Sequence, residues 1–148
     1  MSGLDDLYRE IILDHYRTPR NRGELDPPAV RVEGFNPLCG DEIVVYLAVT
    51  DGVVTDIKLT GQGCSISQAS SSLMSAAVKG KSVDEARAVI GTFKDLMMGP
   101  SATEPTPSEL RKLGELAALA GVVKFPVRIK CATLAWNTLT QALDETSN

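Results

Sequence analysis

The sequence contains few of the residues from which disulfide frameworks and histidine-based active sites are built. It has three cysteines and one histidine among 148 residues, and 5% of its residues are aromatic. The cysteines lie far apart with no C-x-x-C pair, which favours reduced thiols in a cytosol over disulfides. A zinc deaminase would require H-x-E and P-C-x-x-C patterns, and neither occurs. A Cys–His nucleophilic pair is equally unsupported, because His15 is far from every cysteine in sequence.

The chain also lacks an excess of positive charge and a long apolar run. Its net charge is −4 and its basic residues are scattered, which argues against a nucleic-acid-binding surface. No apolar run approaches transmembrane length, and the first residues lack the pattern of a signal peptide. We therefore expect a cytoplasmic protein that binds neither nucleic acid nor membrane. The 148 residues, 43% of them hydrophobic, are expected to form a single domain, 1–148, with its own core.

The first half of the chain predicts a helix followed by a sheet. Apolar residues at helical spacing predict an amphipathic helix over residues 4–17, on which His15 is expected to be an ordinary polar surface residue. Segments rich in β-branched residues predict three strands, over residues 29–35, 42–50 and 53–60. The dipeptide Asp51-Gly52 predicts a tight hairpin between the last two, because both turn positions accept positive φ.

The second half predicts helices. One covers residues 66–78, with Cys64 at its N-terminus and Ser65 or Ser67 as its cap, and Ser82 and Glu85 form a capping box for the next. A second capping box, 106–109, opens a helix that ends at about Ala120, before Gly121. Residues 122–130 are expected to be extended, leading into a last helix over 132–143. The predicted fold class is α+β, a small antiparallel three-stranded sheet with helices packed on one face.

Four residues could form a metal site. Cys39 and Asp41 share a loop broken by Pro37 and Gly40, while Cys64 and Cys131 each lie at a break before a predicted helix. Soft thiolates suit Zn²⁺ or an iron–sulfur cluster, and Asp41 would complete a Cys₃Asp tetrahedron. Isolated cysteines are also common as small buried side chains. The spacing by itself leaves both interpretations open.

The segments around these residues resemble a known family. The segments NPLCGD, GQGCSISQASSSLM and FPVRIKCATLAWNTL, with LYREIILDHYRTPRNRG near the N-terminus, are similar to the iron–sulfur assembly proteins related to IscU. Within that family the sequence is more similar to the SufU branch. IscU-type proteins carry a histidine just before the third cysteine, where this chain has Lys130, and SufU-type proteins have extra residues such as those between Gly80 and Lys124.

This resemblance implies a zinc site made by Cys39, Asp41, Cys64 and Cys131. It implies a zinc-dependent sulfurtransferase that takes persulfide sulfur from a pyridoxal-phosphate-dependent cysteine desulfurase of the SufS type and works with other iron–sulfur assembly proteins. Cys39 would be the sulfur acceptor, and Asp41 the ligand that leaves or is exchanged to free it. For Lys130, the alternatives are a charge that assists the site and simple exposure to solvent.

Two alternatives use the same residues. In the first, the three cysteines hold a nascent iron–sulfur cluster on a scaffold, and Asp41 makes that cluster labile; the lack of a histidine before Cys131 weakens this interpretation. In the second, the zinc is purely structural. Closed structural sites generally use cysteine and histidine only, so an aspartate ligand argues against it.

Overall fold

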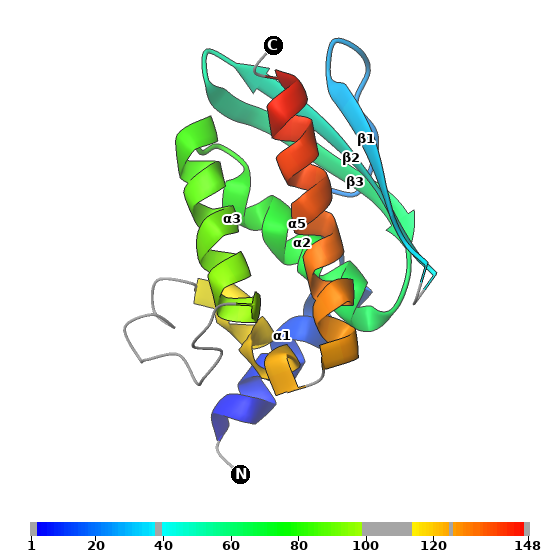
Figure 1. Ribbon diagram of the computed structural model, residues 1–148, viewed down its shortest axis with the longest axis vertical. Coiled ribbons are helices and arrows are strands. Elements are labelled where there is room, and N and C mark those ends of the chain that lie inside the picture. Colours follow the sequence, from blue (N-terminus) through cyan, green and yellow to red (C-terminus); the bar gives the residue numbers. More distant parts are fainter. Residues whose placement is uncertain (1–2, 38–39, 99–113, 125, 147–148) are drawn as a thin grey trace.

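Three antiparallel strands form a sheet, and the helices pack against one of its faces (Figure 1). The computed structural model describes residues 3–37, 40–98, 114–124 and 126–146. The strands are β1 (Val30–Asn36), β2 (Asp41–Thr50) and β3 (Val53–Gln62), in the order β1-β2-β3. The helices are α1 (Gly3–Arg17), α2 (Ser65–Val78), α3 (Val83–Met98), the 3₁₀ helix η1 (Gly114–Lys124) and α5 (Pro126–Thr146). This arrangement confirms the predicted α+β class.

The predicted hairpin joins β2 to β3. Asp51 and Gly52 have φ angles of 53° and 76°, and Thr50 pairs with Val53 across the turn. β3 continues two residues beyond the predicted end, so that Gln62 pairs with Glu42. Because the strands are antiparallel, the start of β2 lies beside the end of β3. This register brings the first residue of β2, Asp41, next to the chain that leaves the sheet toward α2.

The predicted N-cap of α2 is wrong, whereas the predicted capping box of α3 is confirmed. Neither Ser65 nor Ser67 caps α2: Cys64 is the N-cap, and its Sγ accepts a hydrogen bond from the Ser67 N–H at 3.5 Å. The capping box of α3 is confirmed. The Ser82 N–H donates to Glu85 Oε1 at 3.2 Å, and the Glu85 N–H donates to Ser82 Oγ at 3.1 Å. The bond from the Ser82 backbone is the main reason that the pKa of Glu85 is lowered.

The predicted extended segment before the last helix is wrong. The 3₁₀ helix η1 runs through Gly121 to Lys124, and α5 begins at Pro126. Proline suits the first position of a helix, because its φ is already helical and its missing N–H would have no intrahelical acceptor there. Cys131 therefore lies inside α5 and not ahead of it. The predicted capping box 106–109 lies outside the described residues.

Packing around Trp136 holds the helices that carry the two described cysteines. The Trp136 ring is fully buried and stacks on Phe93, with ring centroids 4.2 Å apart and planes at 11°. Its Nε1–H donates to Ser70 Oγ at 2.9 Å, and the Ser70 hydroxyl in turn donates to the carbonyl of Ala132. These bonds tie α2 to α5. None of the helices among the described residues has the length and apolar character needed to cross a membrane.

Candidate metal centre

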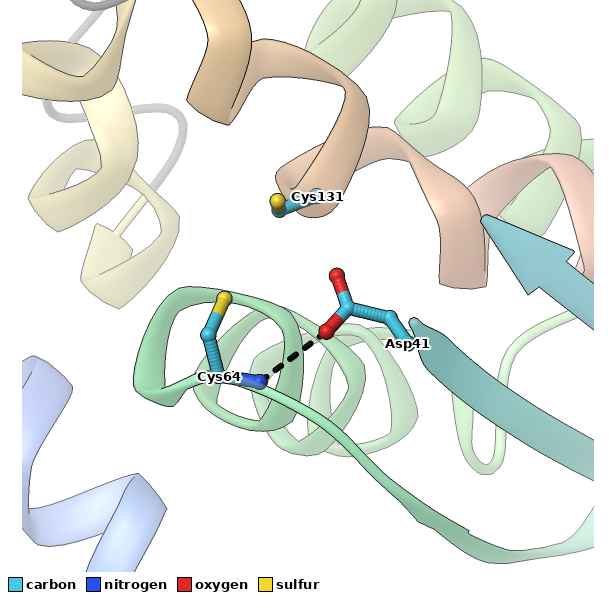
Figure 2. A group of neighbouring side chains, drawn as sticks. All are labelled: Asp41, Cys64 and Cys131. Atoms are coloured by element: carbon cyan, nitrogen blue, oxygen red, sulfur yellow. Dashed lines mark hydrogen bonds between the residues drawn. The ribbon is translucent and has the colours of Figure 1, made fainter. Parts of the chain in front are cut away.

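Three side chains that could bind a metal converge from three elements. Asp41 begins β2, Cys64 caps α2 and Cys131 lies in the second turn of α5, and the three point toward one another (Figure 2). A single ligand atom from each lies within 4.8 Å of the other two. The antiparallel register supplies the first two, and the early start of α5 brings the third above them. The structure thus assembles three of the four residues predicted for a metal site.

Cys39, the fourth predicted ligand, lies outside the described residues. The strands on either side of it are described: Asn36, the last residue of β1, pairs with Asp41, the first residue of β2. The connection between these strands is therefore short. Both of the strand ends that it joins lie at the end of the sheet where Asp41, Cys64 and Cys131 meet. The assignment of Cys39 to the site stays a prediction.

The carboxylate of Asp41 is held in an unusual way for a buried acid. The residue is 0% exposed. Its Oδ1 accepts the Cys64 N–H at 3.0 Å, whereas its Oδ2 has no hydrogen-bond partner among the described residues. A buried carboxylate oxygen without a partner is costly unless a cation or donor meets it. This oxygen lies on the side of the carboxylate toward Cys131 (Figure 2).

These donors fit a zinc ion. Tetrahedral zinc with Zn–S bonds of about 2.3 Å has ligand atoms roughly 3.8 Å apart. The three atoms lie within 4.8 Å of one another, so side-chain movements of about 1 Å or less would bring them to that spacing. Thiolate sulfurs and one carboxylate oxygen are donors that zinc accepts. The unpartnered Oδ2 is the atom available to complete the set.

A basic residue that the sequence reasoning overlooked faces the two cysteines. The charge of Cys64, followed by that of Cys131, raises the pKa of Arg128 above its usual range. Sequence reasoning considered Lys130 instead, because it directly precedes Cys131. In a helix, residues three apart share a face while adjacent residues point about 100° apart, so Arg128 and not Lys130 lies on the face of Cys131. Recognising Pro126 as a helix start would have revealed this.

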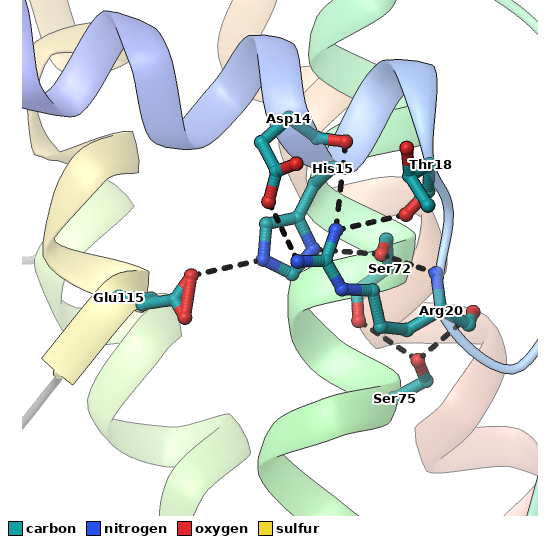
Figure 3. Close-up of polar contacts among 7 residues, drawn as sticks. All are labelled: Asp14, His15, Thr18, Arg20, Ser72, Ser75 and Glu115. Carbon is teal, nitrogen blue, oxygen red and sulfur yellow. Dashed lines mark hydrogen bonds and ion pairs between the residues drawn. The ribbon is translucent and has the colours of Figure 1, made fainter.

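His15, predicted to be a polar surface residue, is instead 2% exposed and bridges three elements (Figure 3). Its Nδ1 lies 2.7 Å from Ser72 Oγ on α2, and its Nε2 lies 3.0 Å from Glu115 Oε1 on η1. Ser72 Oγ also accepts the Arg20 N–H at 2.9 Å. The hydrogen bonds are satisfied if the Ser72 hydroxyl donates to Nδ1 and Nε2–H donates to Glu115. His15 is a structural link between helices and belongs to no metal cluster found among the described residues.

Replacing His15 with alanine is expected to lower the free energy of unfolding by about 1–3 kcal/mol, because the buried Ser72 hydroxyl loses one of its two partners and a cavity remains. Chemical denaturation monitored by circular dichroism measures this. Glu10→Ala, on an exposed position of the same helix, serves as the control and is expected to stay within about 0.5 kcal/mol of wild type. Equal stability of the two variants would contradict the role assigned to His15.

The fold and the site define a class of protein: an α+β domain in which cysteine and aspartate side chains converge at one end of the sheet. The family model described as "NifU-like N terminal domain" matches residues 7–132, and the chain belongs to that family. This confirms the resemblance to SufU- and IscU-like proteins.

Two named relatives and one solved structure agree with this family assignment. The chain is 45% identical to the "Zinc-dependent sulfurtransferase SufU" of Bacillus subtilis over 93% of this chain and 90% of that protein. It is 42% identical to the "Iron-sulfur cluster assembly scaffold protein IscU" of Streptococcus pyogenes, over 100% of this chain and 89% of that protein. The crystal structure of a nitrogen-fixing NifU-like protein from Brucella abortus superimposes with a TM-score of 0.79 at 26% identity, covering 97% of this chain and 99% of that one.

Proposed function

We propose that this protein accepts sulfur from a cysteine desulfurase during iron–sulfur cluster assembly, using a zinc site formed by Cys39, Asp41, Cys64 and Cys131. The observation that carries the proposal is the meeting of ligand atoms of Asp41, Cys64 and Cys131 within 4.8 Å, where one buried carboxylate oxygen has no hydrogen-bond partner among the described residues. The similarity to a relative named as a zinc-dependent sulfurtransferase supports zinc as the metal. When bound, zinc would keep its thiol ligands deprotonated at neutral pH.

Cys39 is the proposed sulfur acceptor. The two described cysteines are less suited to that role: Cys131 is 0% exposed, and Cys64 is engaged as the N-cap of α2. The Cys39 thiolate would attack the outer sulfur of the persulfide carried by the desulfurase. A new S–S bond forms on Cys39, the S–S bond to the desulfurase cysteine breaks, and that cysteine leaves as a thiolate. Only the outer sulfur is transferred, without a change in its oxidation state, so the step needs no added oxidant or reductant.

The neighbouring residues give this step its electrostatic setting. Three thiolates and one carboxylate around Zn²⁺ carry a net charge of −2, and the Arg128 guanidinium beside Cys64 and Cys131 reduces it. Asp41 is the proposed exchangeable ligand, because a hard oxygen binds zinc less strongly than soft thiolates in such a set. The partner is proposed to be a pyridoxal-phosphate-dependent desulfurase of the SufS type, with both proteins and the later assembly factors in the cytoplasm.

The test is to purify the protein, quantify its metal, and add it to the desulfurase with cysteine. We expect tightly bound zinc, a large rise in desulfurase turnover, and a mass increase of one sulfur atom on Cys39. Cys39→Ala is expected to abolish both the rise and the added mass. Lys130→Ala is the matched control, since Lys130 is exposed and a lysine ammonium cannot bind zinc.

A cluster scaffold is the second candidate, favoured by the similarity to a relative named as an IscU scaffold. It predicts a different result in the same experiment: zinc-free protein that assembles a transferable iron–sulfur cluster on its cysteines and leaves desulfurase turnover unchanged. That outcome would overturn the sulfur-transfer proposal. The position before Cys131 favours the first candidate, because a histidine there could act as a further ligand and Lys130 cannot.

A further inference from the structure

The backbone at Gly63 and Cys64 presses directly on the Asp41 carboxylate. The Cys64 N–H donates to Oδ1 at 3.0 Å. A Cβ atom built on Gly63 would overlap Oδ1 and lie 2.9 Å from Cγ and 3.1 Å from Cβ of Asp41. The φ angle of Gly63 lies outside the left-handed region, so any residue could adopt this backbone. Space beside Asp41, and not backbone conformation, therefore makes glycine necessary at this position.

We propose that Gly63 and the Cys64 amide form a backbone clamp that fixes Asp41 as a single-oxygen metal ligand, with Gly63 as a positioning residue. This inference rests on the proposed zinc site. The Cys64 amide is bonded to Oδ1, and Oδ2, which has no hydrogen-bond partner among the described residues, lies on the side of the carboxylate toward Cys131 (Figure 2). Hydrogen bonds to the non-binding atoms of metal ligands commonly orient those ligands and raise metal affinity.

The clamp also explains how Asp41 could exchange without leaving the site. If a ligand from a partner protein displaced Oδ2 at the zinc site, the hydrogen bond from the Cys64 amide to Oδ1 would remain. The carboxylate then stays within reach and can return once the partner departs. The clamp also couples the positions of Asp41 and Cys64, because the backbone that holds the Asp41 carboxylate belongs to Gly63 and Cys64 themselves. A carboxylate bound through both oxygens would have neither property.

Gly63→Ala tests the clamp through metal affinity, measured by competition for zinc with a chromophoric chelator. We expect the zinc Kd of the full-length variant to rise by about tenfold to a hundredfold, as is typical when a group that orients a metal ligand is lost. With Co²⁺ as a spectroscopic probe, the ligand-field bands should change while the sulfur charge-transfer bands remain. Gly91→Ala is the matched control, since Gly91 lies in α3 with open space around its Cβ position, and its Kd should equal that of wild type.

A second substitution tests the mechanism even if the crowded single variant folds poorly. Replacing Asp41 with alanine removes the two closest contacts of a Gly63 Cβ, those with Oδ1 and Cγ, and leaves only the 3.1 Å contact with the Cβ of residue 41. Asp41→Ala/Gly63→Ala should therefore fold nearly as well as Asp41→Ala and bind zinc equally weakly. A Gly63→Ala Kd within twofold of wild type, or a further loss of affinity in the double variant, would overturn the clamp. Wild-type protein that binds no zinc would overturn the metal site itself, so the two failures are distinguishable.

Discussion

Replacing Cys131 with alanine is expected to raise the zinc Kd by about a hundredfold to a thousandfold. Structural zinc in small peptides is bound by four ligands with an apparent free energy of about 10–16 kcal/mol, so one ligand accounts for roughly 2.5–4 kcal/mol. Cys131 is 0% exposed and anchored inside α5, so no solvent-exposed side chain can replace it without moving the helix. Competition with a chromophoric chelator measures the change.

The comparison requires that the variant keep its fold. Alanine suits a helix and fills most of the space of a cysteine. The free energy of unfolding of the metal-free variant should therefore lie within about 1 kcal/mol of that of metal-free wild type. Thr133→Ala removes a comparable buried group from the same turn of α5, one whose hydroxyl donates to the Ile129 carbonyl, and should leave the zinc Kd unchanged. If Cys131→Ala bound zinc as tightly as Thr133→Ala does, Cys131 would not be a ligand.

Replacing Trp136 with alanine is expected to lower the free energy of unfolding by about 3–5 kcal/mol, the largest stability effect we predict. The indole is fully buried, stacks on Phe93 and donates to Ser70, so the substitution removes an aromatic pair and leaves a large cavity between α2, α3 and α5. Urea denaturation of the metal-free protein measures this cost.

Trp136→Phe separates stacking from hydrogen bonding. Phenylalanine keeps an aromatic ring against Phe93 but loses the Nε1–H, while the Ser70 hydroxyl still donates to the Ala132 carbonyl. We expect a cost of about 1–2 kcal/mol, and a zinc Kd close to that of wild type because α2 and α5 remain in place. A Trp136→Phe variant as unstable as Trp136→Ala would show that the hydrogen bond, and not the ring packing, holds these helices together.

Local sequence signals predicted much of the fold because each acts over a few residues. The Asp51-Gly52 turn needs only two positive φ angles, and the Ser82–Glu85 capping box needs only side chains and amides within one turn. The β-branched segments likewise gave all three strands. All four predicted metal-site residues came from motifs, and three of them meet in the described structure.

The errors concern residues whose state depends on distant partners. His15 has the sequence context of an exposed polar residue, yet its ring is buried against Ser72, 57 residues away, and Glu115, 100 residues away. Residues 122–130 alternate like a strand, but there is no fourth strand among the described residues: residues 122–124 belong to η1 and residues 126–130 to α5. Arg128 was overlooked for the same reason, since it reaches the face of Cys131 only once that segment is helical.

The sequence by itself determined the three strands, the hairpin, the first three helices, the family resemblance and the identity of the candidate ligands, because these depend on local backbone preference and on residue type. Tertiary structure decided how the side chains of the candidate ligands are arranged. The pairing of β2 with β3 brings Asp41 to the Cys64 amide, and the packing of α5 buries Cys131 beside a carboxylate oxygen, Oδ2, that has no partner in the described part of the chain. These features arise from contacts between segments far apart in the chain, which no local pattern encodes.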